Sequence, residues 1–321
     1  MPDGAGVNSP FRRGEVTSVP FEFLFKKITK LSKGCGDLAN KLKMAEFLTG
    51  GDMKRIYIAL VLMIVPLCSF AQDILGNVAH YRAEYSYLYK KDSARTGYYK
   101  DIYFLDVCKS GHSYFYSRAN QYRDSVSKAL LAEGEHWAEV AEKIRPLPRG
   151  LKWNLDKRFV EGKYHYTNRL SIHFYRAIEN LRMPQWELKQ DTLTIGGWLC
   201  HKAVATVGGR VWEAWYTPQI PISDGPWLLW GLPGLIIHAK DSNGYFKFRC
   251  ENVGQLAVPY KIVLPADGKE VIEMKMQALL EAEQMYEKDF LKFETTYLGV
   301  ISGSSSAPLP KRKYIPLYVV K

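Results

Sequence analysis

The sequence predicts a mainly β (α+β) protein, built as a curved antiparallel sheet or half-barrel with one inserted and one C-terminal helix. Several segments alternate apolar and polar residues with a period of two, which is typical of strands with one buried face. Gly208-Gly209 and Asn243-Gly244 separate successive strand-like segments and suit hairpin turns. Strands and helices do not alternate along the chain as they do in parallel α/β sheets. We therefore expect a meander around one core.

The first predicted elements are three strands. Residues 79–90 place alanine and tyrosine on one face and mostly charged or polar groups on the other. Residues 102–107 and 113–118 flank Lys109-Ser110-Gly111, which indicates a hairpin.

The two predicted helices cover residues 123–145 and 268–294. Apolar residues recur at helical spacing among charges in both, and Gly134 interrupts the first, which Pro146-Leu147-Pro148 ends. The other strand signals lie at 163–174, 198–207, 210–216, 235–240 and 245–253. Residues 302–310, SGSSSAPLP, are typical of a flexible linker.

A secretory signal peptide is predicted over Met53–Ala71. Lys54-Arg55 forms a basic start, residues 56–67 are apolar except for one tyrosine hydroxyl, and Ser69 and Ala71 take the small-residue positions of a cut before Gln72. The apolar core is shorter than the roughly 20 residues of a membrane span. Cys68 follows Leu67, which is too large for a lipid-modification signal. The sequence therefore predicts a periplasmic or secreted protein with no transmembrane anchor after cleavage.

Residues 1–52 precede this signal and are predicted to be an unstructured extension from a mis-assigned start. A cytosolic N-terminal domain is the alternative. Residues 72–321 are long enough for a single domain with its own core. The whole chain has a formal net charge of +11, and 34 Lys and Arg against 27 Asp and Glu leave +7 after residue 71. These cations are scattered, which argues against nucleic acid as a partner.

The densest motif runs from Trp186 to Ile237 and ends in the hexapeptide Gly231-Leu232-Pro233-Gly234-Leu235-Ile236. Residues 195–203, IGGWLCHKA, lie upstream of it, followed by Gly209-Arg210 with AWYT at 214–217, and by Gly225-Pro226-Trp227. Together these resemble the GLPGLI family, exported Bacteroidetes proteins of uncharacterised function, over about 81–253. Gly197-Trp198 stands where the family usually has Gly-Tyr. The resemblance implies an exported cell-envelope protein and no particular reaction.

Six residues of this segment are candidate binding residues. Trp and Tyr supply large, rigid contact areas, and arginine can hold an anion. They are Arg210, Trp212, Trp215, Tyr216, Trp227 and Trp230. The alternative is structural, with the tryptophans filling the core and Arg210 ending a hairpin or pairing with Glu213 or Asp224. The hexapeptide has no titratable side chain, so it is either a folding device or a backbone-lined pocket wall.

No catalytic residue, metal ligand set or cofactor is predicted. HExxH, CxxC and G-x-S-x-G motifs do not occur. Cys108, Cys200 and Cys250 permit one disulfide after signal cleavage, and the spacing does not select the pair.

The function that we expect is a non-enzymatic binding domain for a lipophilic ligand, a glycan or an envelope partner. A periplasmic hydrolase with an unrecognised site and a structural envelope component are the alternatives. A cavity lined by Trp and Tyr favours the first, a buried acid/base pair the second, and a solid core the third.

Overall fold

The computed structural model describes residues 77–93, 96–264, 266–299 and 314–319. The predicted extension over 1–52, the signal peptide over 53–71 and the linker over 302–310 lie outside these residues. Within the described part of the chain, no helix has both the length and the apolar character that crossing a membrane requires.

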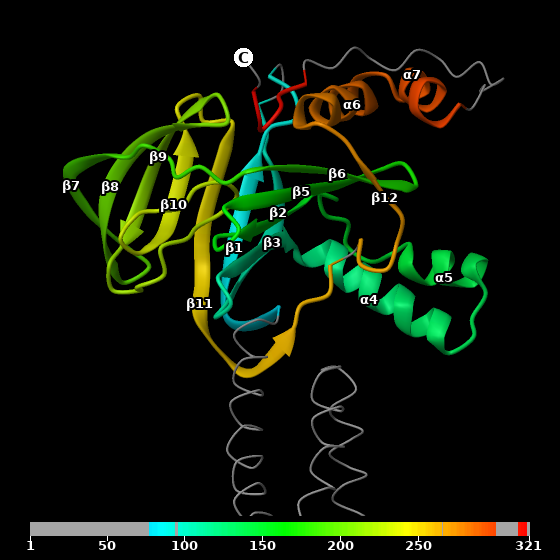
Figure 1. Cartoon of the computed structure of the whole chain (residues 1–321), viewed down its shortest axis with the longest axis horizontal. Helices are drawn as coiled ribbons and strands as arrows, with labels where there is room; N and C mark the ends of the chain where they lie inside the picture. The colour runs from blue at the N-terminus through cyan, green and yellow to red at the C-terminus, as the bar shows by residue number, and fades with distance from the viewer. Residues whose placement is uncertain (1–76, 94–95, 265, 300–313, 320–321) are drawn as a thin grey trace, which may run out of the picture. The chain divides into compact units, whose positions relative to one another are not determined.

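A 12-stranded open sheet dominates the structure (Figure 1). Its strands lie in the order β12-β6-β5-β4-β3-β2-β1-β11-β10-β9-β8-β7. Their bounds are β1 Val78–Tyr89, β2 Tyr99–Cys108, β3 His112–Ser117, β4 Asn154–Arg158, β5 Lys163–Leu170, β6 His173–Asn180, β7 Glu187–Ile195, β8 Trp198–Val207, β9 Arg210–Thr217, β10 Leu235–Asp241, β11 Phe246–Lys261 and β12 Val271–Glu273. The predicted mainly β class is confirmed.

The sheet is mixed because β12 pairs with β6 in parallel, whereas the other neighbours pair antiparallel. The predicted hairpins at 109–111, 208–209 and 243–244 are confirmed. The run at 163–174 is two strands, β5 and β6, because the chain turns at Ser171, which has a positive φ of 53°. Residues 271–273, expected in a helix, form β12 instead.

Among the described residues, five helical segments accompany the sheet: α4 Arg118–Ala132, α5 Trp137–Ile144, α6 Met276–Lys288, α7 Phe290–Phe293 and the π-helix η3 Glu294–Leu298. The single helix expected over 123–145 is two helices. The Ser117 side chain caps the first by accepting from the Asn120 amide, and Gly134, with φ of 90°, follows its end.

One hydrophobic core covers the inner face of the sheet. It joins Leu155 and Tyr166 from one half of the sheet with Trp212 and Cys200 from the other, and helix α6 adds Leu279. Residues so far apart in strand order meet because the sheet curves. The core therefore lies within the curve, together with the cavity described below.

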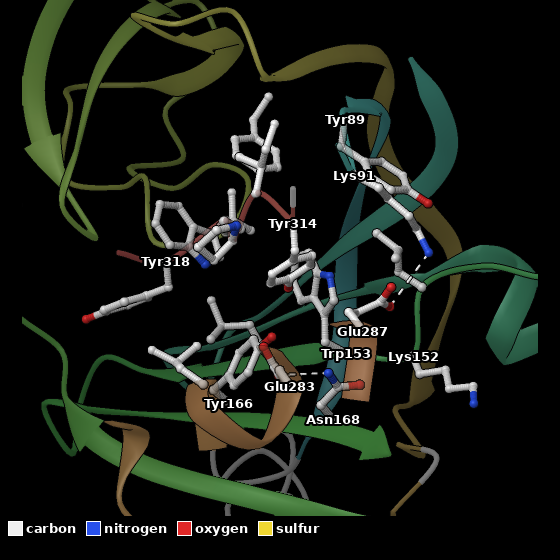
Figure 2. A pocket seen from close by; sticks show the side chains of 18 of the residues that line it. Tyr89, Lys91, Lys152, Trp153, Tyr166, Asn168, Glu283, Glu287, Tyr314 and Tyr318 are labelled. Atoms are coloured by element: carbon white, nitrogen blue, oxygen red, sulfur yellow. Dashed lines mark hydrogen bonds and ion pairs between the residues drawn. The ribbon is translucent and has the colours of Figure 1, made fainter. Parts of the chain in front are cut away.

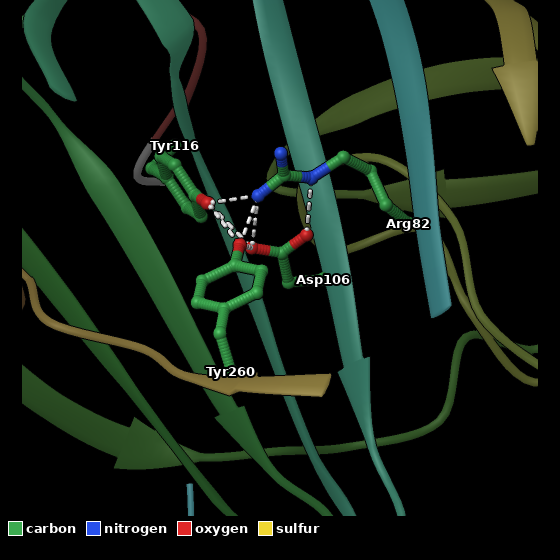
Figure 3. Close-up of polar contacts among 4 residues, drawn as sticks. All are labelled: Arg82, Asp106, Tyr116 and Tyr260. Carbon is green, nitrogen blue, oxygen red and sulfur yellow. Dashed lines mark hydrogen bonds and ion pairs between the residues drawn. The ribbon is translucent and has the colours of Figure 1, made fainter. Parts of the chain in front are cut away.

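A second, smaller cluster lies on the opposite face of β1, β2 and β3. Arg82 donates to both carboxylate oxygens of Asp106, at 2.7 and 2.9 Å (Figure 3). Tyr116 and Tyr260 donate to the same carboxylate, whose exposed fraction is 0%. Since Tyr260 belongs to the end of β11, this network fastens that strand across the outer face of the sheet. Every group in it has a partner, so we assign it a structural role.

Candidate functional site

A cavity of about 330 Å³ opens on the inner face of the sheet. Its walls come from the ends of β1 and β4, from β5, from helix α6 and from the chain segment Tyr314–Val319, which we call the C-terminal strap (Figure 2). Ten of the residues that line it are aromatic: Tyr87, Tyr89, Trp153, Tyr164, Tyr166, Trp227, Phe246, Tyr286, Tyr314 and Tyr318. The volume is in the range of small-molecule sites, roughly 300–1,000 Å³.

Trp153 forms a wall of this cavity and is held rigidly. Its ring centroid lies 4.7 Å from that of Tyr103 and 6.0 Å from that of Tyr166. The Tyr103 hydroxyl also donates to the Trp153 carbonyl at 3.3 Å. A ligand would therefore meet a preformed aromatic face.

Glu283 is the buried acid of the cavity. It projects from α6, accepts a hydrogen bond from the Asn168 amide at 2.8 Å and hydrogen bonds with Tyr166 (Figure 2). Burial raises the pKa of the Glu283 carboxyl to about 7, which brings its titration close to neutral pH. One turn further along α6, Glu287 lies 3.7 Å from the Lys91 ammonium. The cavity thus offers both aromatic faces and hydrogen-bonding groups.

The motif loop, residues 218–234, is fixed to the sheet by a buried ion pair. Lys157 on β4 has an exposed fraction of 0% and donates to Asp224 and to the Gly225 carbonyl. The Gly225 amide donates to the same Asp224 oxygen at 2.7 Å. Burial lowers the pKa of the Lys157 ammonium, and Asp224 opposes that shift. The sequence offered Asp224 as a possible partner of Arg210, and the structure pairs it with Lys157.

The hexapeptide lies partly in the core, with Pro233 exposed and Gly231 half-buried. Leu232, Leu235 and Ile236 are buried, and the Tyr85 hydroxyl donates to the Ile236 carbonyl at 2.7 Å. The Ile236 amide donates to the Asp224 carbonyl at 3.1 Å, which ties the hexapeptide to the preceding loop. Residues 231–236 do not line the cavity, whereas Trp227 and Leu228 just before them do.

The six candidate binding residues are dispersed. Trp212, Tyr216 and Trp227 are buried, and Trp215 and Trp230 are half-buried. Trp227 alone among the six lines the cavity, and it adopts a positive φ of 52°, a strained conformation for a bulky residue. Their part in binding stays a prediction.

Arg210 pairs with neither of the two acids considered from the sequence. It lies 3.2 Å from Asp241 and donates to the carbonyls of Pro316 and Leu317 in the C-terminal strap. Its charge is therefore directed at the strap.

Sequence reasoning missed Trp153, Asn168 and Glu283, which meet in the cavity. Asn168 lies in a predicted strand, Glu283 in a predicted helix and Trp153 in no predicted element. The sequence does not show how these segments pack against one another. The signal that could have pointed to Glu283 is a glutamate on the apolar side of helix α6, beside Leu279 and Ala282, which are buried.

The cysteine thiols and the possible metal ligands of the described residues add no second candidate site. Cys108, Cys200 and Cys250 are buried free thiols. No three His, Cys, Asp or Glu side chains within the described ranges are arranged to hold a metal ion.

Comparison with known proteins adds a partial family match. Residues 208–238 match the family described as "Protein of unknown function (Porph_ging)", and no curated protein matches the chain. The fold is similar to two solved structures, described as "Structure of PNGF-II in C2 space group" and "Structure of PNGF-II in P21 space group". Both have a TM-score of 0.41, with 14% and 12% sequence identity, and the match covers 62% and 63% of this chain. The chain spans about a third of the length of these structures, 32% in each case.

Proposed function

We propose that this protein is a binding domain that holds a small, ring-bearing ligand with hydroxyl groups, such as a short glycan, in its aromatic cavity. The observation that carries the proposal is the cavity of about 330 Å³ walled by Trp153, Trp227 and several tyrosines. Rigid aromatic faces stack on sugar rings and bury their apolar sides. A structural component would instead have a filled core.

The polar groups favour a hydroxylated ligand over a purely lipophilic one. Tyrosine hydroxyls line the same cavity as Asn168, Glu283 and Lys91. A carboxyl that titrates near neutral pH can donate to a hydroxyl group when protonated and accept from one when ionised. An alkyl chain would meet these groups without satisfying them, which costs binding free energy.

The test uses neutral disaccharides, including cellobiose and lactose, with decanoate as the lipophilic probe. We expect at least one disaccharide to quench tryptophan fluorescence saturably. Glu283→Gln should weaken that binding about tenfold, because it alters one hydrogen bond between the protein and a ligand hydroxyl. Such a hydrogen bond contributes roughly 1–2 kcal/mol to the free energy of binding. Glu281→Gln, on the exposed side of the same helix, is the matched control and should bind as the wild type does. Saturable binding of decanoate with no response to any disaccharide would contradict the proposed ligand class.

A hydrolase is the second candidate, because a carboxyl with a pKa of about 7 in a cavity suits a general acid. The same variant separates the two functions. In a hydrolase, Glu283→Gln abolishes turnover of the bound disaccharide and leaves binding intact, and the wild-type rate falls as pH rises through about 7, because the acid loses its proton.

We further propose that the chain is a GLPGLI family protein, exported through Met53–Ala71, with residues 72–321 as its one functional domain and 1–52 dispensable. The match over 208–238 to a family of unknown function supports the first part, and the basic–apolar–small layout of 53–71 supports the second. N-terminal sequencing of the protein from the cell envelope should begin at Gln72. Recovery from the cytoplasm with residues 1–52 attached would contradict export.

A further inference from the structure

The C-terminal strap is bound to the rest of the molecule largely through its backbone. The Ile315 amide donates to the Lys91 carbonyl at 3.3 Å, and Tyr314 forms an antiparallel bridge with Asp92. Arg210 donates to two successive strap carbonyls, those of Pro316 and Leu317. The Val319 amide donates to the Gly208 carbonyl at 2.8 Å. Anchoring an extended segment by its main chain is how proteins recognise peptides.

The strap side chains add sequence preference. Ile315 is buried in the main core. The Tyr318 ring packs edge-on against Trp227 with centroids 5.9 Å apart, and its hydroxyl hydrogen bonds with Tyr164. The groove beneath the strap thus suits an aromatic–aliphatic–proline–aliphatic–aromatic segment.

The β8–β9 turn is shaped around this segment. Gly209 has a φ of 74°, and a side chain there would collide with the Val319 carbonyl and lie 2.9 Å from the Val319 Cβ. Gly208, with φ of 56°, leaves room for the Trp227 ring in the same way. Each residue of Gly208-Gly209-Arg210 therefore helps to hold the strap. The Gly208 carbonyl accepts a hydrogen bond from it, Gly209 allows it to approach closely, and Arg210 donates to its carbonyls.

The strap also divides the inner face. Tyr318, Tyr164 and Leu228 line both the aromatic cavity and a neighbouring hollow of about 600 Å³ beside residues 179–185. Figure 2 shows Tyr314 and Tyr318 of the strap beside the other residues that line the cavity. Removing the strap would join the two spaces into one groove.

We propose that the groove beneath the strap is a peptide-docking site, and that its occupant in trans is the C-terminal strap of a second copy of this chain. Exchange of identical segments between copies recreates every contact described above, because the same groove meets the same sequence. A strap in cis belongs to the same chain as its groove and competes at a high effective concentration with a strap in trans, so the closed monomer dominates unless its own strap is weakened. This inference does not depend on the ligand of the cavity.

Two complementary full-length variants test it. The strap-weakened chain carries Ile315→Ser and Tyr318→Ala, and keeps an intact groove. The groove-weakened chain carries Arg210→Gln and keeps an intact strap. Each variant alone should have the monomer mass by light scattering, whereas an equimolar mixture should contain a species of twice that mass. Gly209→Ala is a second groove-weakened chain, in which the added methyl group collides with the strap.

A labelled peptide of residues 313–320 gives an independent measurement on the strap-weakened chain alone. It should bind at least tenfold more tightly to that chain than to the wild type, whose groove is filled, and a peptide carrying Ile315→Ser and Tyr318→Ala should not bind. Absence of peptide binding to a strap-weakened chain that still unfolds cooperatively would overturn the proposal. Loss of the fold in the strap-weakened chain would also overturn it, because the strap would then be an inseparable part of the core.

Discussion

Asp224→Ala should lower the free energy of unfolding by about 3–5 kcal/mol, because it leaves the Lys157 ammonium buried without its carboxylate. The Lys157 side chain has an exposed fraction of 0%, so bulk water does not solvate its ammonium in place of the lost carboxylate. The Gly225 amide loses its 2.7 Å hydrogen bond at the same time. Urea denaturation followed by tryptophan fluorescence measures the change.

Two controls isolate the buried charge as the cause. Glu187→Ala removes one partner of the exposed Lys189–Glu187 pair and should cost no more than about 1 kcal/mol. Adding Lys157→Met to Asp224→Ala should recover most of the lost stability, since replacing both members of a buried pair by apolar groups is often close to neutral. If Asp224→Ala costs no more than Glu187→Ala, the ion pair does not hold the motif loop.

Gly234→Ala should have the second large effect, a loss of about 2–4 kcal/mol from backbone strain and overpacking together. Gly234 has a φ of 144°, and a Cβ there would collide with the Thr217 carbonyl oxygen and lie 2.6 Å from its carbon. These are backbone atoms of β9, which pairs with β10 at Leu235↔Thr217. The clash can be relieved only by moving the strand pair.

Gly197→Ala provides the matched comparison. Gly197 also has a positive φ, 89°, but a Cβ there would meet no atom within 4 Å. Gly197→Ala should therefore lower the free energy of unfolding only through the unfavourable positive φ, by roughly 1 kcal/mol. Equal losses from the two substitutions would show that the hexapeptide glycine is required for its φ alone and not for the close approach to β9.

Local sequence patterns predicted most of the sheet. The period-two alternation at 79–90 and the hairpin glycines at 208–209 and 243–244 depend on neighbours in sequence, so they gave the strands and turns directly. Strand β4 was missed because Asn154–Arg158 lacks an alternating apolar pattern: Asp156 and Lys157 are buried through their charged partners. Strand β12 was missed because it is three residues long and pairs in parallel with β6, which is distant in sequence.

For the candidate site too, the sequence predicted the local features and the tertiary structure determined the long-range contacts. The sequence by itself marked the tryptophan- and glycine-rich segment from Trp186 to Ile237 as the distinctive part of the chain. It also supplied a family resemblance and a signal-peptide pattern, since these are contiguous along the chain. Only the tertiary structure decided that Arg210 faces the C-terminal strap, that Asp224 pairs with Lys157, and that Trp153, Asn168 and Glu283 surround one cavity. Those contacts join residues from about 67 to 115 positions apart. They depend on how the sheet curves, which follows from the packing of its two halves around one core and not from any local pattern.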